Sequence, residues 1–407
     1  MKRRTFLQRS VMAAGVLLAG PATFAGASVI GQQTTRKELP VVVLEGSPRQ
    51  RGRIHGESLR EKIKELMAFW KEDICRSYEV DDPDRFIEEF LADTDFPAAI
   101  RTWTPDLLEE VHGLAEGSGI DFPTMLAFQF GDEEWWYGRN RYYGIEITEA
   151  DKCSVAGVFD PGTTPVLGQN LDIPTFYDGF QALLHIKHED SSLESFVPTH
   201  VGYVSLNGIN NRGIAVVVNA LLQLNQCIDG LPVAFVIRGI LEQETYEDAV
   251  EFVETVKHAS GQAYTIGGLN EIACFECSAN ATPQFIPFEG ATRIYHTNDP
   301  LVNDDQSIYK RLLAKHPPKY KRYGPGNSEI RLGSLERRLI DPKRRIGLPE
   351  IVEALSSRDD PRNPVCRTLE DGGGLTFGCM VMELAQSPVL HYAPGPACCT
   401  EFNVYRF

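Results

Sequence analysis

The sequence predicts an α+β layered fold in which two β-sheets are covered by helices. In the front third of the 407-residue chain, apolar residues recur three and four positions apart, which is the period of an amphipathic helix. From Cys153 onward the pattern changes to short β-branched runs separated by Gly, Pro, Asn and Asp, which is typical of an antiparallel sheet. Two helical stretches interrupt these strands, and this order favours sheets covered by helices.

The predicted helical region extends from Gly46 to Gln129. Apolar side chains repeat on one face of its first long helix: Leu59, Ile63, Leu66, Met67, Trp70 and Ile74. Further helices are predicted in "PDLLEEVHGLAEGSG" and "DFPTMLAFQF", and only "ELPVVVLEG" has the pattern of a strand. We therefore expect residues 28–152 to form a mostly helical N-terminal segment.

Most of the predicted strands lie in residues 153–407. They begin with "CSVAGVFD", "PVLGQNLDI", "ALLHIKHE", "HVGYVSLN" and "GIAVVVNAL". The two helices are "PVAFVIRGILEQ" and "TYEDAVEFVETVK", and the second starts with an approximate capping box of Thr245 and Asp248. The strands "QAYTIGGL", "EIACFECSA" and "TRIYHTND", a basic helical region, and the strands "LTFGCMVMEL", "PVLHYAPG" and "EFNVYRF" complete the chain.

Residues 1–27 have the parts of an export signal. Arg3 and Arg4 precede an apolar run from Val11 to Gly20, and the small residues of 25–27 follow. The alternative of a membrane anchor is disfavoured, because a span needs about 20 apolar residues. We therefore expect export by the twin-arginine route to the periplasm or the extracellular space, and no membrane span in the mature protein.

The charge and the cysteines exclude several classes of function. The net charge of −16, with no basic run interleaved with aromatic residues, argues against nucleic-acid binding. Nine cysteines leave at least one unpaired within the chain. In "CFEC", Cys274 and Cys277 lie three apart in a strand and point to opposite faces, and Cys398 and Cys399 diverge likewise, so neither pair has the geometry of a zinc site. We expect no metal and no cofactor.

Cys153 is the candidate nucleophile. The chain has no Gly-x-Ser-x-Gly turn, Walker loop or His-Glu-x-x-His motif, and no local pattern connects a histidine to Cys153. A cut between Lys152 and Cys153 would create an α-amine that titrates near about 7.7 to 8.0 and could serve as the base. The alternative is that Cys153 is a small buried hydrophobic residue.

Five blocks occur in a fixed order along the chain: "GSPRQRGRIHGESLREKI", "CSVAGV" with "LGQNLD", "NGINNRGIAVVVNALLQ" followed by "GLPVAFVIRGILEQ", "HTND", and "GPACCTEFNVYRF". Together they resemble the acyl-coenzyme A:6-aminopenicillanic acid acyltransferase family, also called isopenicillin N acyltransferase-like proteins, over most of residues 40–407. The resemblance implies an N-terminal-nucleophile (Ntn) hydrolase with an αββα four-layer sandwich. It also implies an inactive precursor that its own cysteine cuts into two associated chains, here 28–152 and 153–407.

The resemblance implies roles for single residues. Cys153 corresponds to the nucleophile, and Lys152 to the residue before the cut. Asp172 matches the acid that holds the new amine or orients the nucleophile, although a turn residue that closes a strand is the alternative. Asn219 matches the oxyanion-hole asparagine, whose amide N–H meets the charge on the substrate carbonyl oxygen. A structural role would still require hydrogen-bond partners for an amide in this apolar run.

Three further residues are candidates for either substrate binding or a structural role: Asn170, His296 and Asn298. A lone histidine such as His296 is more often a hydrogen-bonded structural residue. One departure from the family concerns the substrate. Where the penicillin acyltransferase has Ser-Arg before its last strands, this chain has Gly372-Gly373, which argues against a penicillin-type substrate and transferase specificity.

The expected function is that of a self-processing cysteine amidohydrolase or acyltransferase. It would act on a small acyl amide or acyl thioester through an acyl-enzyme on Cys153, with its cleaved N-terminal fragment as a partner. Two alternatives remain open at this point. One is a peptidase of the same fold, and the other is a non-catalytic exported protein that binds a small molecule.

Overall fold

The computed structural model describes residues 37, 39–143, 153–189, 191–315, 326–341 and 344–407. These residues belong to one compact unit. The predicted export signal and Lys152, the residue before the predicted cut, lie outside the described residues. Within the described ranges, no helix combines the length and the apolar character that a membrane crossing requires.

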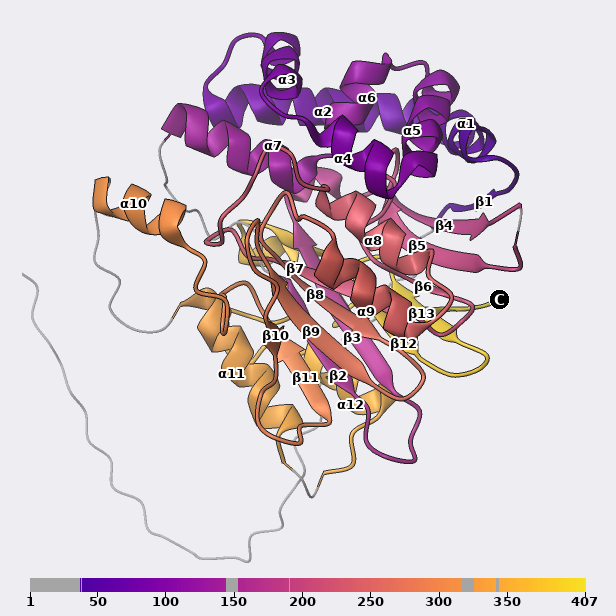
Figure 1. Ribbon diagram of the computed structural model, residues 1–407. Coiled ribbons are helices and arrows are strands. Elements are labelled where there is room, and N and C mark those ends of the chain that lie inside the picture. Colours follow the sequence, from indigo (N-terminus) through magenta and orange to yellow (C-terminus); the bar gives the residue numbers. More distant parts are fainter. Residues whose placement is uncertain (1–36, 38, 144–152, 190, 316–325, 342–343) are drawn as a thin grey trace, which may run out of the picture. The chain divides into compact units, whose positions relative to one another are not determined.

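The N-terminal segment is mostly helical, as its periodicity predicts. In the described part it contains β1 (Val41–Leu44), α1 (Pro48–Ser58), α2 (Arg60–Tyr78), α3 (Pro83–Ala92), α4 (Phe96–Trp103), α5 (Pro105–Ser118), α6 (Phe122–Phe128), α7 (Gly131–Gly138) and a π-helical turn (Arg139–Tyr143). Proline stands in the first turn of α1 and of α3 to α6, where its missing N–H costs no intrahelical hydrogen bond. Figure 1 shows these helices gathered at one end of the strands.

Helices α1 and α5 pack closely because glycines line both of them. Gly52 and Gly56 of α1 meet the backbone of α5, and Gly113 and Gly117 of α5 meet the backbone of α1. A Cβ atom added to Gly52 would lie 1.8 Å from the Glu110 carbonyl oxygen, closer than two such atoms can approach. The two backbones therefore approach where side chains are absent.

Two sheets form the centre of the fold. The larger has the strand order β1-β4-β5-β6-β7-β8-β9-β10 and is antiparallel except for the β1–β4 pair. The smaller is antiparallel, in the order β11-β2-β3-β12-β13-β14. The remaining strands are β2 (Ser154–Val158), β3 (Val166–Ile173), β4 (Gln181–Lys187), β5 (Glu194–His200), β6 (Gly208–Asn210), β7 (Ala215–Ala220), β8 (Gln262–Gly267), β9 (Ile272–Cys277), β10 (Gln284–Phe285), β11 (Arg293–His296), β12 (Leu375–Glu383), β13 (Val389–Ala393) and β14 (Asn403–Arg406).

Helices cover the outer face of each sheet (Figure 1). Helices α8 and α9 pack on the larger sheet, and α11 and α12 pack on the smaller one. The C-terminal helices are α8 (Val233–Leu241), α9 (Tyr246–Thr255), α10 (Ser307–Lys315), α11 (Asn327–Leu339) and α12 (Leu348–Leu355). Three apolar cores fill the spaces between these four layers, and the middle core, with Val155 and Val217, lies between the sheets. The predicted α+β fold, an αββα four-layer sandwich with a mostly helical N-terminal segment, is confirmed.

One predicted strand is wrong. The stretch "HVGYVSLN" is predicted to form a strand, but only its first residue, His200, lies in one, as the last residue of β5. Turns and irregular backbone fill 201–207 before β6 begins. Gly202 has φ of +77°, a left-handed conformation that no regular strand contains. The β-branched residues of this stretch are buried in the core without forming a ladder.

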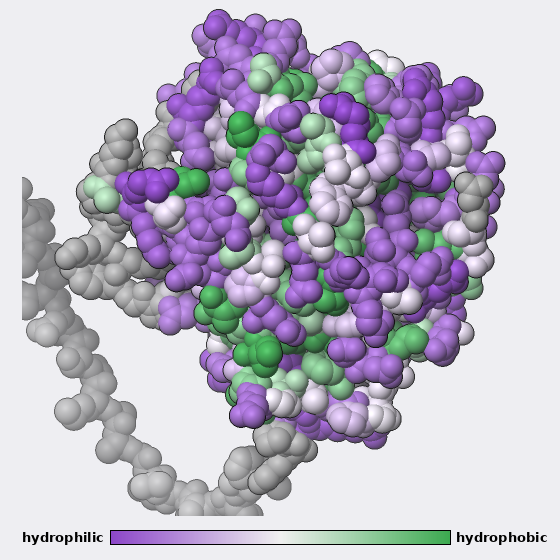
Figure 2. Space-filling model, viewed as in Figure 1, coloured by the Kyte–Doolittle hydropathy of each residue, from purple (hydrophilic) through white to green (hydrophobic). Residues whose placement is uncertain are grey.

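Figure 2 shows one face of the molecule, which is mainly hydrophilic. Apolar side chains are scattered over it, as on most protein surfaces. This pattern agrees with the net charge of −16, which favours solubility.

Candidate active site

The register of the smaller sheet brings Cys153 next to Asp172. Cys153 comes directly before β2 and is buried in the core between the sheets. Because Ser154 pairs with Asn170 across β2 and β3, the residue before Ser154 lies beside the end of β3. The Cys153 Sγ is 3.9 Å from the backbone oxygen of Asp172. An antiparallel pair of strands therefore joins two residues that are nineteen positions apart.

Asp172 is held within β3 and is not a turn residue, so the alternative of a turn residue that closes a strand is wrong. Its side chain is 1% exposed, and its Oδ1 accepts a hydrogen bond from the Thr376 hydroxyl at 2.6 Å. Thr376 is the β12 partner of Asp172 in the ladder. Its hydroxyl also accepts the backbone N–H of Arg367 at 2.9 Å. This chain of hydrogen bonds fixes the direction of the carboxylate.

Arg331 belongs to the same cluster and was not found by sequence analysis. It lies on α11, is 1% exposed, and its Nη1 donates to the Cys153 carbonyl oxygen at 2.7 Å and to the Ser154 Oγ at 2.8 Å. Its Nε donates to the Asn327 Oδ1 at 2.8 Å. Burial lowers the pKa of Arg331 to about 10, although the nearby Asp172 opposes this shift. Arg331 stays protonated at neutral pH and anchors the strand start at Cys153.

The side chain of Asn219 points between the two sheets. On β7, Ala215 and Val217 belong to the core between the sheets, while Val216 and Val218 face the helices, and alternation puts Asn219 with the first pair. The side chain is fully buried. Neither its Nδ2 nor its Oδ1 makes a hydrogen bond within the described part of the chain. A buried amide without partners is costly, and a ligand that hydrogen-bonds to it would remove that cost.

Gln169 connects the two sheets beside Asn219. This β3 residue pairs with Val155 of β2, and its Nε2 donates to the backbone oxygen of Val218 on β7. Val155 lies two positions after Cys153, and Val218 directly precedes Asn219. The hydrogen bond therefore brings the unpaired amide into the neighbourhood of the candidate nucleophile.

Asn298 connects β7 with Arg331 of α11. Its Nδ2 donates to the Ala220 carbonyl oxygen at 3.1 Å, and its Oδ1 accepts from the Arg331 Nη2 at 2.9 Å. Since Arg331 also donates to Cys153, a continuous chain of hydrogen bonds runs from Cys153 to the residue after Asn219. Asn298 is thus part of the scaffold around the candidate site.

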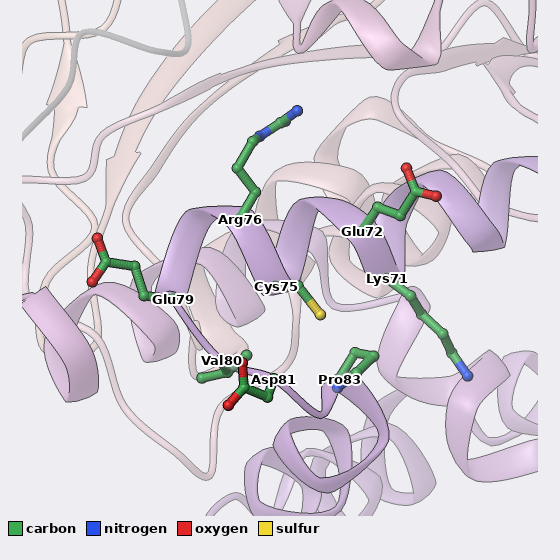
Figure 3. Close-up of a pocket in the computed structure, with 8 residues that line it drawn as sticks. All are labelled: Lys71, Glu72, Cys75, Arg76, Glu79, Val80, Asp81 and Pro83. Atoms are coloured by element: carbon green, nitrogen blue, oxygen red, sulfur yellow. The ribbon is translucent and has the colours of Figure 1, made fainter.

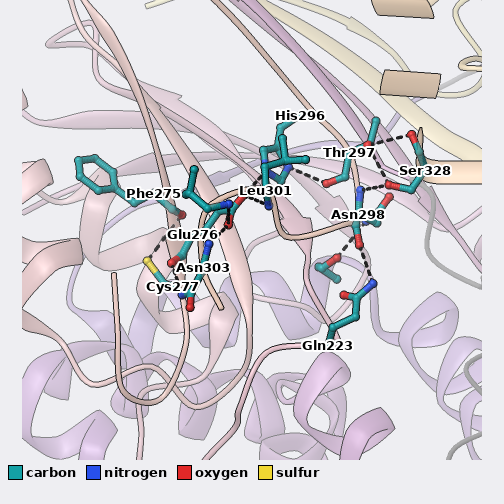
Figure 4. Close-up of polar contacts among 12 residues, drawn as sticks. Gln223, Phe275, Glu276, Cys277, His296, Thr297, Asn298, Leu301, Asn303 and Ser328 are labelled. Carbon is teal, nitrogen blue, oxygen red and sulfur yellow. Dashed lines mark hydrogen bonds and ion pairs between the residues drawn. The ribbon is translucent and has the colours of Figure 1, made fainter. Parts of the chain in front are cut away.

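His296 and Asn170 have structural contacts. His296 is fully buried, and its ring nitrogens contact the Thr297 carbonyl oxygen at 2.6 Å and the Glu276 carboxylate at 2.9 Å (Figure 4). Asn170 donates from its Nδ2 to the carbonyl oxygens of Leu355 at 2.6 Å and Val365 at 2.9 Å, which ties the end of α12 to β3. Both residues therefore hold the fold together around the cluster.

The two cysteines of "CFEC" do not form a pair. Cys274 packs in the core between the sheets and Cys277 in the outer core, so "CFEC" points its thiols to opposite faces, as predicted. No group of three His, Cys, Asp or Glu residues within those ranges could hold a metal ion. The groove in Figure 3 lies between α2 and α3, and burial with acidic neighbours raises the pKa of its Cys75. A raised pKa makes that thiol a poor nucleophile.

A protein-family model, described as acyl-coenzyme A:6-aminopenicillanic acid acyl-transferase, matches residues 158–373, just over half of the chain. The chain belongs to this family. Members of this acyltransferase family are Ntn-type hydrolases and acyltransferases that act on amide bonds, so the protein is an enzyme of this class. The matched region contains Asp172, Asn219, Asn298 and Arg331, and it begins shortly after Cys153.

Three solved structures with some similarity to the chain each align with 63% of it. The Caenorhabditis elegans ortholog of N-acylethanolamine-hydrolyzing acid amidase is 16% identical, with a TM-score of 0.41 and all of its own chain covered. A conjugated bile acid hydrolase from Clostridium perfringens is 13% identical (TM-score 0.37, 97% of its chain covered). A penicillin V acylase from Agrobacterium tumefaciens is 12% identical (TM-score 0.36, 86% covered). No curated protein sequence matches the chain.

Proposed function

We propose that the protein is a self-processing cysteine amidohydrolase or acyltransferase that acts on a small acyl amide or acyl thioester. One observation carries the proposal. A buried cysteine and an unpaired amide, Cys153 and Asn219, lie between the two sheets, and a fixed carboxylate and a buried guanidinium, Asp172 and Arg331, lie near the start of β2 on the helix-covered side of the smaller sheet. These are the groups that an acyl transfer needs.

In the proposed processing step, the Cys153 thiol attacks the carbonyl carbon of Lys152. The acyl group moves from nitrogen to sulfur, the thiol proton goes to the departing nitrogen, and water then hydrolyses the thioester. Arg331 supports this step because it holds the Cys153 carbonyl oxygen and so fixes the strand that presents the thiol. Holding reactants in place can remove roughly 7 to 11 kcal/mol of a barrier.

In the proposed turnover, the new α-amine of Cys153 takes the thiol proton, and Sγ attacks the substrate carbonyl. The Nδ2–H of Asn219 donates to the oxyanion that forms. The intermediate collapses when the amine or thiol leaving group takes the proton, which leaves an acyl thioester on Cys153. Water or an acceptor amine then releases the acyl group. The carboxylate of Asp172 orients the amine.

The substrate is proposed to be other than a penicillin. Gly372 and Gly373 are both exposed with φ of +70°, so this position presents backbone and no side chain. The penicillin acyltransferase has Ser-Arg where this chain has these glycines. A side chain that recognises the substrate must therefore come from elsewhere.

A substrate screen tests the proposed function. The purified mature protein is incubated with small N-acyl amides, acyl thioesters and peptides, and intact mass reports any acyl group on Cys153. We expect turnover of amides or thioesters and an acylated thiol. Turnover of peptides alone would favour the peptidase. An uncut chain with an unreactive Cys153 would favour the non-catalytic binding protein.

A further inference from the structure

Arg367 is a buried cation whose hydrogen-bonding capacity is mostly unused. Its side chain is 2% exposed, and its Nη1 donates to the Gly372 carbonyl oxygen at 2.7 Å. Its Nε and Nη2 are buried and make no hydrogen bond within the described ranges. Unsatisfied N–H groups on a buried charge lower the stability of the fold, so the presence of these two groups calls for a functional explanation.

The acids close to Arg367 are engaged elsewhere. Asp371 accepts from the Nη1 and the Nη2 of Arg358, both at 2.8 Å. Asp172 accepts from Thr376 at 2.6 Å. The Nε and Nη2 of an arginine lie on one edge of the planar guanidinium, and their parallel N–H groups match the two oxygens of a carboxylate. The unused edge of Arg367 therefore has the geometry for a bidentate carboxylate.

The backbone of Arg367 joins it to the candidate site. Its carbonyl oxygen accepts the Thr376 N–H at 3.0 Å, and its own N–H donates to the Thr376 hydroxyl at 2.9 Å. That hydroxyl in turn donates to Asp172. The guanidiniums of Arg367 and Arg331 are also near each other. Burial is the main cause that lowers the pKa of Arg331, and the positive charge of Arg367 lowers it further.

We propose that Arg367 binds a carboxylate of the substrate through its Nε and Nη2. The inference rests on the proposed function and names the substrate class, which is amides or thioesters that carry a carboxylate on one side of the scissile bond. Charge supports it, because the neighbouring carboxylates already have partners: Asp371 pairs with Arg358, and Asp172 accepts from Thr376. A bound carboxylate would satisfy both unused donors and pair the buried guanidinium of Arg367.

Two matched pairs of compounds test the inference on the processed protein. In the first pair, an N-acyl glycine and its glycinamide, the carboxylate or carboxamide is on the amine side of the scissile bond. In the second pair, a glutaryl anilide and its terminal carboxamide, it is on the acyl side. We expect the carboxylate to be preferred in kcat/KM by roughly tenfold to a hundredfold in one pair, as for hydrogen bonds to a charged group. That pair identifies the side of the scissile bond on which Arg367 binds the carboxylate. Equal rates in both wild-type pairs would overturn the inference.

Variants assign the preference to Arg367. Arg367→Gln should remove the preference for the carboxylate, mainly through a higher KM for the carboxylate compound. Arg367→Lys should retain part of the preference, because the positive charge stays while the two parallel N–H groups are lost. Arg345→Gln, at an exposed arginine, is the matched control and should keep the preference. A full preference in Arg367→Gln would contradict the assignment.

Thermal unfolding separates a binding role from a structural one. Without ligand, Arg367→Met should unfold at the same temperature as wild type or higher, because it removes an unpaired buried charge. Arg331→Met should unfold at a lower temperature, because it breaks hydrogen bonds to Cys153 and Asn327. A drop for Arg367→Met as large as that for Arg331→Met would identify a structural arginine.

The same measurement decides the inference if none of the four compounds is turned over. That result would count against the proposed function, but binding remains measurable. A carboxylate compound should raise the unfolding midpoint of wild type while its carboxamide does not, and Arg367→Gln should lose this difference. No difference between the two compounds in wild type would overturn the carboxylate site.

Discussion

The polar side chains of the candidate site differ in how many hydrogen bonds they make with the rest of the protein. Arg331 donates to the Cys153 carbonyl oxygen, to Asn298 and to other partners, whereas the Asn219 amide makes no hydrogen bond within the described residues. The satisfied groups hold the backbone in place. The unsatisfied amide can then meet a charge that develops only during the reaction, without first breaking a bond.

Replacement of Asn219 tests the proposed oxyanion donor. Asn219→Ala should lower kcat by roughly a hundredfold to a thousandfold, the usual loss for one such donor. The fold should persist, because the amide has no partner to lose within the described ranges. Steady-state kinetics and thermal unfolding check both parts. Activity within a few-fold of wild type in a folded variant would make Asn219 structural.

Asn170→Ala is the matched control for that variant. Asn170 is equally buried, but its Nδ2 donates to the carbonyl oxygens of Leu355 and Val365. Its loss should therefore lower the free energy of unfolding by about 1 to 3 kcal/mol, since two buried acceptors lose their donor. The two asparagines should thus separate an effect on turnover from an effect on stability.

At the scale of elements, the first turn of α7 contains three acids, of which Glu133 and Glu134 are buried and Asp132 is half-buried. The Oε1 of Glu133 accepts from the Val233 N–H at 3.0 Å and from the Ser260 hydroxyl at 2.6 Å. Burial, with the nearby Asp132, raises the pKa of Glu133 to about 8. The folded protein therefore keeps this proton in a pH range where the unfolded chain has lost it.

This shift predicts a pH-dependent stability. Between the ordinary glutamate pKa of about 4.3 and the raised value of about 8, the folded state binds more protons than the unfolded state, so stability falls as the pH rises. Glu133→Gln should make this fall shallower, because it removes one titrating group. Urea unfolding at pH 5 and pH 8 measures the difference. An unchanged difference between the two pH values would rule out Glu133 as a contributor.

The glycine contact between α1 and α5 gives a second prediction at this scale. A Cβ atom on Gly113 would lie 2.0 Å from the Arg49 carbonyl oxygen, so Gly113→Ala must push the helices apart. We expect a loss of roughly 1 to 3 kcal/mol in the free energy of unfolding. In Gly333→Ala on α11, the new Cβ meets only a flexible Arg337 side chain at 3.4 Å, and stability should be unchanged or higher. Equal free energies of unfolding in urea for Gly113→Ala and Gly333→Ala would contradict the close packing of α1 and α5.

At the scale of the whole molecule, the proposed processing converts one chain into two associated chains. The purified protein should contain two fragments, with the second beginning Cys153-Ser154-Val155. Cys153→Ala should remain a single inactive chain, because it loses the nucleophile and the new amine together. Cys227→Ala, at a partly buried cysteine whose pKa burial raises, is the control and should be cut normally. An uncut and fully active wild-type chain by intact mass would falsify the mechanism.

Export is the other prediction for the whole molecule. Residues 1–27, fused to a reporter that must fold before transport, should carry it out of the cytoplasm, because the twin arginine precedes a short apolar run. Replacement of Arg3 and Arg4 by lysine should stop the transport, as measured by reporter activity outside the cytoplasm. Unchanged transport of the double variant would leave the general secretory route.

The sequence by itself determined the layers and the candidate nucleophile. Periods of 3.6 and 2 are local properties of a chain, so the helical front, the strands from Cys153 onward and the opposite faces of Cys274 and Cys277 could be predicted from neighbouring residues. The ordered sequence blocks indicated the family and, through it, Asp172 and Asn219. One local signal misled, because the left-handed Gly202 ends a β-branched run that resembles a strand.

Only the tertiary structure decided which cations belong to the candidate site. Arg331 lies in a basic helical stretch among other arginines, and nothing local distinguishes it, yet it contacts Cys153 from 178 positions away in the chain. The unpaired amide of Asn219 and the unused donors of Arg367 were equally invisible in the sequence. The physical reason is that burial and hydrogen-bond satisfaction depend on which surfaces the packed layers bring together, and residues far apart in the chain supply those surfaces.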